Sequence, residues 1–143
     1  MEVGSIMTRD VITIKHNESI KDAVIKLRKY KKSGFPVVDD EGNVVGVFSE
    51  TDILDKLPDI FEESDKIPMI DVQELTTPPV STVMGKPPIT VNSKEDIRNV
   101  ARIFLEKYIH RVPVVDDGKL VGIVSLGDLL KAFSEVKLCY PNC

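Results

Sequence analysis

The sequence predicts an α+β fold made of two β-α-β-β-α repeats, packed sheet to sheet with pseudo-two-fold symmetry. The first observation behind this prediction is an internal repeat, because the second half follows the first at a shift of 77 residues, which becomes 76 after the hairpin turn. The segment Pro36-Val37-Val38-Asp39-Asp40 returns as Pro113-Val114-Val115-Asp116-Asp117. The second observation is size: one repeat alone has too few residues to bury both faces of a sheet. Two copies packed together solve that problem.

Each repeat is expected to open with a short apolar strand, at 11–14 and 89–91, and to continue with an amphipathic helix. The helix is indicated by apolar residues at i, i+3, i+4 and i+7. They are Ile20, Ala23, Val24 and Leu27 in the first copy, and Ile97, Val100, Ala101 and Phe104 in the second. Ser19 and Asp96 occupy matching positions before these runs, and both residue types are good N-caps.

A hairpin and a second helix are expected to complete each repeat. The hairpin strands are predicted at 35–38 and 44–48, and again at 112–115 and 120–124, around turns rich in Asp and Gly. The closing helices are predicted at about 51–57 and 127–133. The resulting division is repeat 1 at 1–57, a connecting strap at 58–79, repeat 2 at 80–134 and a tail at 135–143. The proline-rich strap is either packed on the surface or functional.

Composition limits the function classes. The formal net charge is −4 and the sequence pI is about 5.2, whereas a general polyanion binder is normally basic, so nucleic acid is not an expected partner. No apolar run approaches the ~20 residues of a membrane helix, and no signal peptide is visible. The two cysteines, Cys139 and Cys143, lie in the last five residues, where they cannot cross-link the body of the chain. These features favour a cytoplasmic location. They do not predict a metal site, since structural zinc needs four ligands.

The sharpest motif is Gly-x-x-Ser-x-x-Asp, which occurs once in each repeat where a strand runs into a helix. It starts at Gly46 and at Gly122. A helix N-terminus offers backbone N–H groups to a phosphate, and the Asp carboxylate can accept hydrogen bonds from the vicinal hydroxyls of a ribose. Ser-x-x-Asp is also a capping pattern, which would repeat in both copies for purely structural reasons. Both interpretations stay open at this point.

A second candidate is the segment before each hairpin proline. It reads Lys32-Ser33-Gly34-Phe35 in repeat 1 and Ile109-His110-Arg111-Val112 in repeat 2. Gly34 would let a flat ligand approach the backbone, and His110-Arg111 would supply charged donors to phosphates. The alternative is that the His-Arg pair merely faces water near a helix end, where cations are favourable.

The ordered set Met-x-x-x-x-Ile-Thr-Ile, amphipathic helix, Pro-Val-Val-Asp and Gly-x-x-Ser-x-x-Asp, found twice, resembles the CBS domain family, named after cystathionine β-synthase. The resemblance implies a paired module, often a homodimer, with two clefts that hold AMP, ADP, ATP, S-adenosylmethionine or relatives such as methylthioadenosine. Carried over by position, it implies a first cleft lined by Ser49, Thr51, Asp52, Pro88, Ile89, His110, Arg111 and Val112. It implies a second cleft lined by Ile12, Ser33, Gly34, Phe35, Ser125 and Asp128.

The two implied clefts differ. Gly127 stands where the first has Thr51, and Ser33-Gly34 stand where repeat 2 has His110-Arg111. The prediction is therefore that the Asp52 cleft prefers a phosphorylated ligand, while the other takes a less charged adenosyl ligand or none. The alternative function is a structural dimerisation module without a physiological ligand. No catalytic triad, phosphate loop or metal-ligand cluster is visible, so an enzyme is not expected and no cofactor is required. A separate effector protein would receive the signal.

Overall fold

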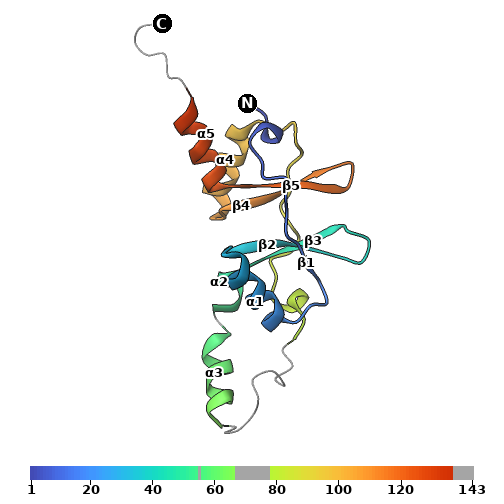
Figure 1. Ribbon diagram of the computed structural model, residues 1–143, viewed down its shortest axis with the longest axis vertical. Coiled ribbons are helices and arrows are strands. Elements are labelled where there is room, and N and C mark those ends of the chain that lie inside the picture. The colour runs from blue at the N-terminus through green and yellow to red at the C-terminus, as the bar shows by residue number, and fades with distance from the viewer. Residues whose placement is uncertain (55, 67–77, 137–143) are drawn as a thin grey trace, which may run out of the picture. The chain divides into compact units, whose positions relative to one another are not determined.

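The computed structural model describes residues 1–54, 56–66 and 78–136, and within it the chain packs as two compact units. One unit is Ile12–Pro88; the other joins Met1–Val11 to Ile89–Cys143 (Figure 1). The expected mixture of helices and strands is confirmed. No helix in the described ranges combines the length and the apolar character that crossing a membrane requires.

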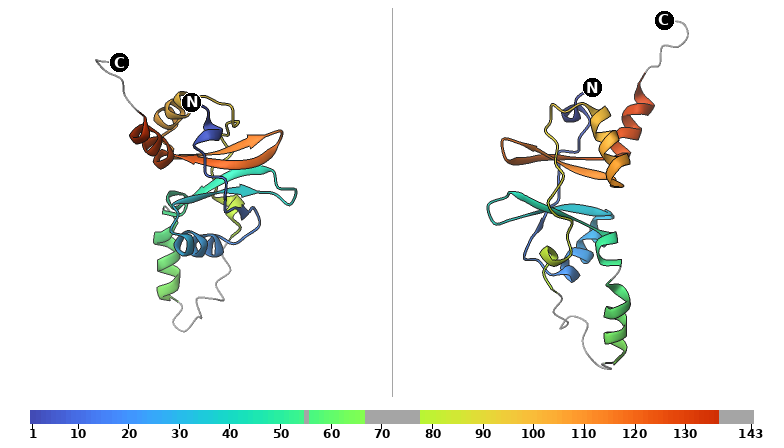
Figure 2. Two further views of the ribbon diagram at one scale, coloured as in Figure 1. Left: turned by 45° about the horizontal axis from the view of Figure 1, so that its top comes forward. Right: turned by 180° about the vertical axis from the view of Figure 1, so that it is seen from behind.

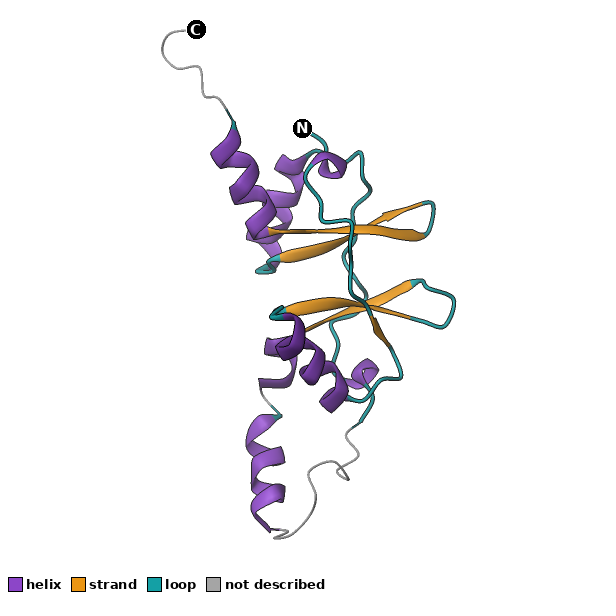
Figure 3. Cartoon of the chain, viewed as in Figure 1, coloured by secondary structure: helices purple, strands orange, loops and turns teal. Residues whose placement is uncertain are grey.

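The Ile12–Pro88 unit contains a three-stranded sheet in the order β1-β2-β3 (Figure 3). The strands are β1 (Ile14–Lys15), β2 (Gly34–Val38) and β3 (Val44–Ser49), with β1 parallel and β3 antiparallel to β2. The helices are α1 (Ile20–Tyr30), α2 (Glu50–Leu54), α3 (Leu57–Lys66) and the short 3-10 turn η3 (Val80–Thr82).

The second unit repeats this plan with a two-stranded sheet in place of the three-stranded one. It contains η1 (Val3–Ser5), α4 (Ile97–Lys107), β4 (Arg111–Asp116), β5 (Lys119–Ser125) and α5 (Leu126–Glu135). β4 and β5 are antiparallel, and a single parallel bridge from Val91 to Val114 takes the place of β1. In both views of Figure 2, α4 and α5 lie side by side on one side of the β4–β5 hairpin.

Each unit is completed by a segment that comes from the other repeat of the sequence. The N–H of Val3 bonds the carbonyl of Glu95 at 2.8 Å, and Thr8 exchanges two backbone hydrogen bonds with Ile123 at 2.8 and 2.9 Å. At the shift of 77, the N–H of Val80 bonds Glu18 at 2.8 Å, and Gly85 exchanges bonds with Val47 at 2.9 and 3.1 Å. The boundaries predicted from the repeat describe homologous halves of the sequence, whereas the packing units divide the chain elsewhere.

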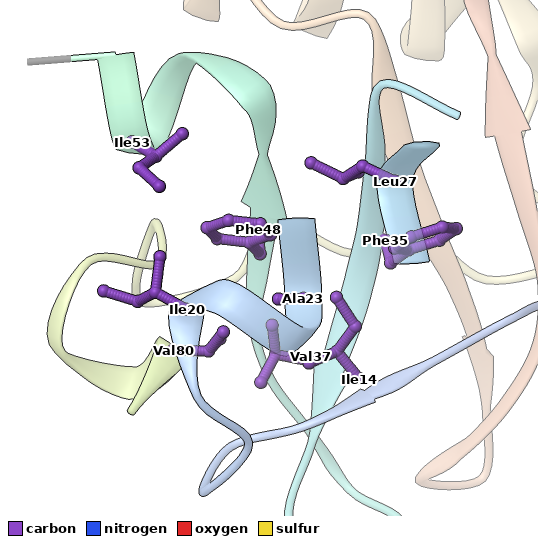
Figure 4. Close-up of a cluster of buried hydrophobic side chains, with 9 residues drawn as sticks. All are labelled: Ile14, Ile20, Ala23, Leu27, Phe35, Val37, Phe48, Ile53 and Val80. Atoms are coloured by element: carbon purple, nitrogen blue, oxygen red, sulfur yellow. The ribbon is translucent and has the colours of Figure 1, made fainter. Parts of the chain in front are cut away.

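The core of the Ile12–Pro88 unit lies between α1 and the sheet (Figure 4). The predicted helix face supplies Ile20, Ala23 and Leu27, which are buried against side chains of all three strands, with Val24 partly buried beside them. Val80, from the segment after the strap, is fully buried in the same cluster. The second unit has the matching core, to which Val100 and Phe104 of α4 and Val3 contribute.

Both N-cap predictions for the first helices are confirmed. Ser19 Oγ accepts from the N–H of Asp22, and the Asp96 carboxylate accepts from the N–H of Arg98. The helix predicted at 51–57 differs: α2 ends at Leu54 and α3 starts at Leu57. Pro58 therefore sits in the first turn of a new helix, where its missing N–H costs nothing. The rest of the predicted strap, 67–77, and the tail with Cys139 and Cys143 lie outside the described residues.

Candidate functional site

The two Gly-x-x-Ser-x-x-Asp motifs form strand-to-helix junctions, β3 into α2 at Ser49 and β5 into α5 at Ser125. Each junction is held against the start of the neighbouring strand, because Ser49 pairs with Gly34 and Ser125 pairs with Arg111. One further bond fastens each helix start to the residue before that strand. The N–H of Glu50 bonds the Ser33 carbonyl at 2.9 Å.

The matching bond in repeat 2 joins the N–H of Leu126 to the His110 carbonyl at 2.8 Å. These two bonds change the expectation that phosphate would find free backbone donors at the helix starts. The first N–H of each helix is already satisfied by the chain. The side chains of the junctions therefore carry more of the binding argument than the helix ends do.

At the β5–α5 junction, Ser125 and Asp128 form a reciprocal capping box. The N–H of Asp128 donates to Ser125 Oγ at 3.2 Å, while Asp128 Oδ2 accepts from the N–H and the hydroxyl of Ser125 at 2.9 and 3.1 Å. The other carboxylate oxygen, Oδ1, accepts only a long bond of 3.5 Å from the Thr8 hydroxyl. Capping thus uses Oδ2 of Asp128, whereas Oδ1 accepts only the long hydrogen bond from Thr8.

The β3–α2 junction uses its carboxylate in the same divided way. Asp52 Oδ2 accepts from the N–H of Ser49 at 2.7 Å and from its hydroxyl at 3.2 Å. Ser49 Oγ also lies 2.9 Å from Thr51 Oγ1. No group in the described part of the chain bonds Oδ1 of Asp52. The capping and ligand-binding interpretations are therefore compatible, since each needs a different oxygen.

The glycine that begins each motif is explained by packing. A Cβ on Gly46 would lie 2.5 Å from Met84 Sδ and 2.9 Å from the Gly85 carbonyl oxygen. A Cβ on Gly122 would lie 2.7 Å from Met7 Sδ and 2.9 Å from the Thr8 carbonyl oxygen. Glycine is thus needed where the exchanged segment crosses the strand.

Inside each unit the structure brings together residues that the resemblance assigns to different clefts. Ser33, Gly34 and Phe35 adjoin the Ser49–Asp52 junction, and His110, Arg111 and Val112 adjoin the Ser125–Asp128 junction. The residues implied for the first cleft are divided between the units: Ser49, Thr51, Asp52 and Pro88 belong to one, and Ile89, His110, Arg111 and Val112 to the other. The second set is divided likewise, with Ile12, Ser33, Gly34 and Phe35 in one unit and Ser125 and Asp128 in the other.

The exposure of these residues limits what each can offer. Phe35 and Val112 are buried in the cores of their units, so a ligand would meet their backbone and not their side chains. His110 is exposed, and Arg111, Ser49 and Asp128 are half-buried. Both cleft assignments stay predictions.

Thr8 was not among the residues predicted for a site. Its hydroxyl lies beside the Asp128 carboxylate although 120 positions separate the two residues. The sequence gives one indication of a difference at this position, since the repeat shift of 77 aligns Thr8 with Gly85. The Asp128 junction thus has a hydroxyl that the Asp52 junction lacks, while Asp52 has Thr51 where Asp128 has Gly127.

The first aspartate of each hairpin turn accepts hydrogen bonds from the chain, Asp39 within its own turn and Asp116 from Ser93. Asp39 Oδ1 accepts from the N–H groups of Glu41 and Asn43, both at 2.9 Å, and these bonds lower the pKa of Asp39. Asp116 accepts from the hydroxyl of Ser93 at 2.5 Å and from its N–H at 2.9 Å, which lowers the pKa of Asp116. No group of three or more His, Cys, Asp or Glu side chains suited to a metal occurs within residues 1–54, 56–66 and 78–136.

Comparison with known proteins decides the family. The family model described as CBS domain matches residues 3–59 and 80–135. The chain belongs to the CBS domain family. The resemblance found in the duplicated motifs is thereby confirmed, and the two matched ranges correspond to the two repeats of the sequence.

Several known proteins are similar to this chain over most of its length. Uncharacterized protein MJ1404 of Methanocaldococcus jannaschii is 38% identical over 95% of this chain, which spans only 32% of that protein's length. The crystal structure of CBSX2 in complex with AMP has a TM-score of 0.78 and 31% identity, covering 96% of this chain and 98% of that one. The CBS domain pair of MJ0100 in complex with 5-methylthioadenosine and S-adenosyl-L-methionine has a TM-score of 0.78 and 28% identity, covering 96% and 98%.

Proposed function

We propose that this chain is a regulatory module that binds an adenine nucleotide or a related adenosyl compound through the two strand-to-helix junctions. One observation carries the proposal: each motif carboxylate uses Oδ2 for the N–H and the hydroxyl of its motif serine, while Oδ1 accepts at most the long bond from Thr8 to Asp128. A ribose presents two vicinal hydroxyls, which are donors of the right kind. CBS domain pairs are generally regulatory, so we expect binding without catalysis.

The solved relatives support the ligand class. CBSX2 binds AMP, and the MJ0100 pair binds methylthioadenosine and S-adenosylmethionine. These ligands share an adenosyl group and differ in charge at the 5′ position. The adenosyl group is therefore what we expect this chain to recognise, with the charged end deciding between ligands.

We further propose that the two sites are unequal. The Asp52 site, with Thr51 and with His110-Arg111 as phosphate donors, is expected to prefer a phosphorylated ligand such as AMP or ATP. The Asp128 site is expected to take a less charged adenosyl compound or to remain empty. The proximity of His110 and Arg111 to Ser125 within their own unit offers the opposite assignment, in which the Asp128 site takes the phosphate.

Calorimetric titration of Asp52→Ala and Asp128→Ala with AMP, ATP and S-adenosylmethionine tests both statements. Loss of AMP binding in Asp52→Ala but not in Asp128→Ala supports the assignment, and the reverse result supports the opposite one. Asp96→Ala is the matched control, since it also removes a carboxylate cap but from α4. Absence of heat with every adenosyl ligand in the unaltered protein would contradict the function itself.

The alternative function, a structural dimerisation module, predicts a different response to nucleotide. Each motif substitution would then cost only about 1 kcal/mol, the scale of a lost cap, and nucleotide would leave the melting temperature unchanged. A ligand at ~100 times its dissociation constant stabilises a protein by about 2.7 kcal/mol, so thermal melts separate the two functions. The homodimer, the effector protein and the cytoplasmic location are also kept as predictions.

A further inference from the structure

Two methionine side chains lie where the exchanged segments cross the strands. Met84 Sδ would lie 2.5 Å from a Cβ placed on Gly46, and Met7 Sδ would lie 2.7 Å from a Cβ placed on Gly122. Each thioether thus fills the space that the motif glycine leaves open and packs its segment against the strand. Methionine suits such a position, because its unbranched thioether side chain adapts to irregular gaps.

The two methionines differ in exposure. Met7 is 9% exposed and belongs to the buried cluster of its unit. Met84 is only half-buried and packs against the outside of its cluster. The surface beside Met84 is open, because the next residue, Gly85, is exposed and a Cβ added there would lie 3.7 Å from its nearest neighbour, the Val47 carbonyl oxygen. A small polar oxidant therefore has better access to Met84 than to Met7.

The segment that carries Met84 is attached to its unit on both sides of this residue. On one side, Val80 is fully buried in the cluster of Figure 4, and its N–H bonds the Glu18 carbonyl at 2.8 Å. On the other side, Gly85 exchanges two backbone hydrogen bonds with Val47 of β3, at 2.9 and 3.1 Å. A chemical change at the Met84 sulfur is therefore placed to affect the pairing of this segment with β3.

We propose that Met84 is a modification site, oxidised reversibly to the sulfoxide by hydrogen peroxide or an organic hydroperoxide, and that its oxidation loosens residues 80–85 from β3. The sulfur lone pair attacks one peroxide oxygen, and the S–O bond forms as the O–O bond breaks. The departing oxygen takes up the proton of the attacked oxygen and leaves as water or an alcohol. The thioether is oxidised by two electrons and the peroxide is reduced by two. Methionine sulfoxide reductases restore the thioether, which makes the change reversible.

The sulfoxide would disturb the packing that the thioether makes. Oxidation turns an apolar side chain into a polar one and adds an oxygen to a sulfur that already lies too close to Gly46 to admit a Cβ. The N–H groups of Gly85 and Val47 are bonded to each other's carbonyls, so neither is free to donate to the new oxygen. A buried oxygen without a donor is unfavourable, and the side chain is expected to turn towards water and leave Gly46. Ligand binding plays no part in this inference.

Treatment of the full chain with hydrogen peroxide, followed by mass spectrometry of its peptides, tests the site. Met84 is expected to gain an oxygen about 10-fold faster than Met7, because the susceptibility of a sulfur to oxidation follows its exposure. Dithiothreitol added after the peroxide reverses disulfides and sulfenic acids at Cys139 and Cys143 but leaves methionine sulfoxide in place. The later measurements therefore report on methionine oxidation.

Thermal melts and amide hydrogen exchange test the consequence with a matched pair of variants. Met84→Leu and Met7→Leu each remove one sulfur at nearly constant side-chain volume. Peroxide is expected to lower the melting temperature of the unaltered protein and of Met7→Leu by roughly 3–6 °C, but not that of Met84→Leu. It is also expected to speed exchange in residues 80–85 and in β3 by ~10-fold, again except in Met84→Leu. Met1 and Met69 are present in all three proteins, so an effect of their oxidation is common to them.

Three results would overturn the proposal. Met84 could be oxidised no faster than Met7, which would show that its exposure gives no selectivity. Peroxide could lower the melting temperature of Met84→Leu as much as that of the unaltered protein, which would assign the effect to another residue. Exchange in residues 80–85 could stay unchanged after oxidation of Met84, or could rise equally in β5, which would exclude a local release. Incubation with sulfoxide reductases of both stereospecificities is expected to reverse the changes, and titration with AMP reports separately on ligand binding.

Discussion

Replacing Gly122 with alanine tests whether the motif glycine is there for packing. The added Cβ would meet Met7 Sδ at 2.7 Å, Met7 Cγ at 3.0 Å and the Thr8 carbonyl oxygen at 2.9 Å. A methionine side chain can move, but a backbone carbonyl on a paired segment cannot do so without breaking its hydrogen bonds. Thr8 is held by two such bonds to Ile123, at 2.8 and 2.9 Å.

The loss of folding stability in Gly122→Ala depends on which of these contacts can relax. Overpacking of this kind typically costs about 1–3 kcal/mol, and the fixed carbonyl places Gly122→Ala in the upper half of that range. For a chain of this length, such a loss lowers the melting temperature by roughly 4–10 °C. Met7 is buried in the core of its unit, so Met7→Ala is itself destabilising. In that background Gly122→Ala should cost less than in the unaltered protein, because the closest contact is gone, whereas the clash with the carbonyl remains.

Urea unfolding followed by circular dichroism measures this prediction. Gly85→Ala is the control, because Gly85 lies on the other exchanged segment. A Cβ added at Gly85 would lie 3.7 Å from its nearest neighbour, the Val47 carbonyl oxygen, which is an ordinary contact. The control is expected to lie within ~0.5 kcal/mol of the unaltered protein. If Gly122→Ala were as stable as the control, the packing explanation would fail, and the glycine would have to be explained by a ligand.

Two further predictions concern stability. Gly127→Ala is expected to stabilise the protein by about 0.5 kcal/mol, because alanine loses less backbone entropy than glycine on folding. Gly127 lies in the first turn of α5, where an added Cβ would lie 3.5 Å from its nearest neighbour, Ser125 Oγ. A thermal melt that shows destabilisation would refute this prediction. Asp116→Asn is expected to destabilise the protein at neutral pH, because the bonds from Ser93 lower the pKa of Asp116 below its ordinary value of 3.8. A lowered pKa means that the stabilisation is present above the ordinary value and is lost as the pH falls through the folded-state value, so the stabilities of the two proteins should converge only at a pH below 3.8.

Local patterns predicted the elements of the fold well, because capping and periodicity are local properties. The apolar spacing around Ile20 identified the buried face of α1, and Ser19 and Asp96 marked the starts of α1 and α4. The sequence assigns 58–66 to the connecting strap, where 59–63 could make a helical turn, whereas the structure has the full helix α3, Leu57–Lys66, with Pro58 tolerated in its first turn. The strand predicted at 11–14 proved shorter, since ladder pairing is limited to Ile14 and Lys15.

The exchange of segments between the repeats could not be predicted in this way. The sequence around Met7 and Met84 shows that these segments are equivalent, but periodicity does not tell which repeat each one packs against. Only the structure places Met7 over Gly122 and Met84 over Gly46. The same limit explains why Thr8 was overlooked, because its neighbour Asp128 is distant in sequence and the contact depends on the exchange.

The exchange also bears on how a CBS module of this kind would report a ligand. The Asp128 carboxylate is joined to its own helix by Ser125 and, through Thr8, to the segment that the chain contributes from its other end. A ribose hydroxyl that donates to Oδ1 would compete with the long 3.5 Å bond from Thr8 but not with the cap on Oδ2. Binding would then weaken or break the hydrogen bond between Thr8, in the N-terminal segment, and Asp128, while the capping bonds at the start of α5 stay intact. At the Asp52 junction the equivalent residue is Gly85, which has no hydroxyl, so the same event has no such connection. If both junctions bind a ribose, they are therefore expected to respond differently, because only the Asp128 junction has the Thr8 hydroxyl beside its carboxylate.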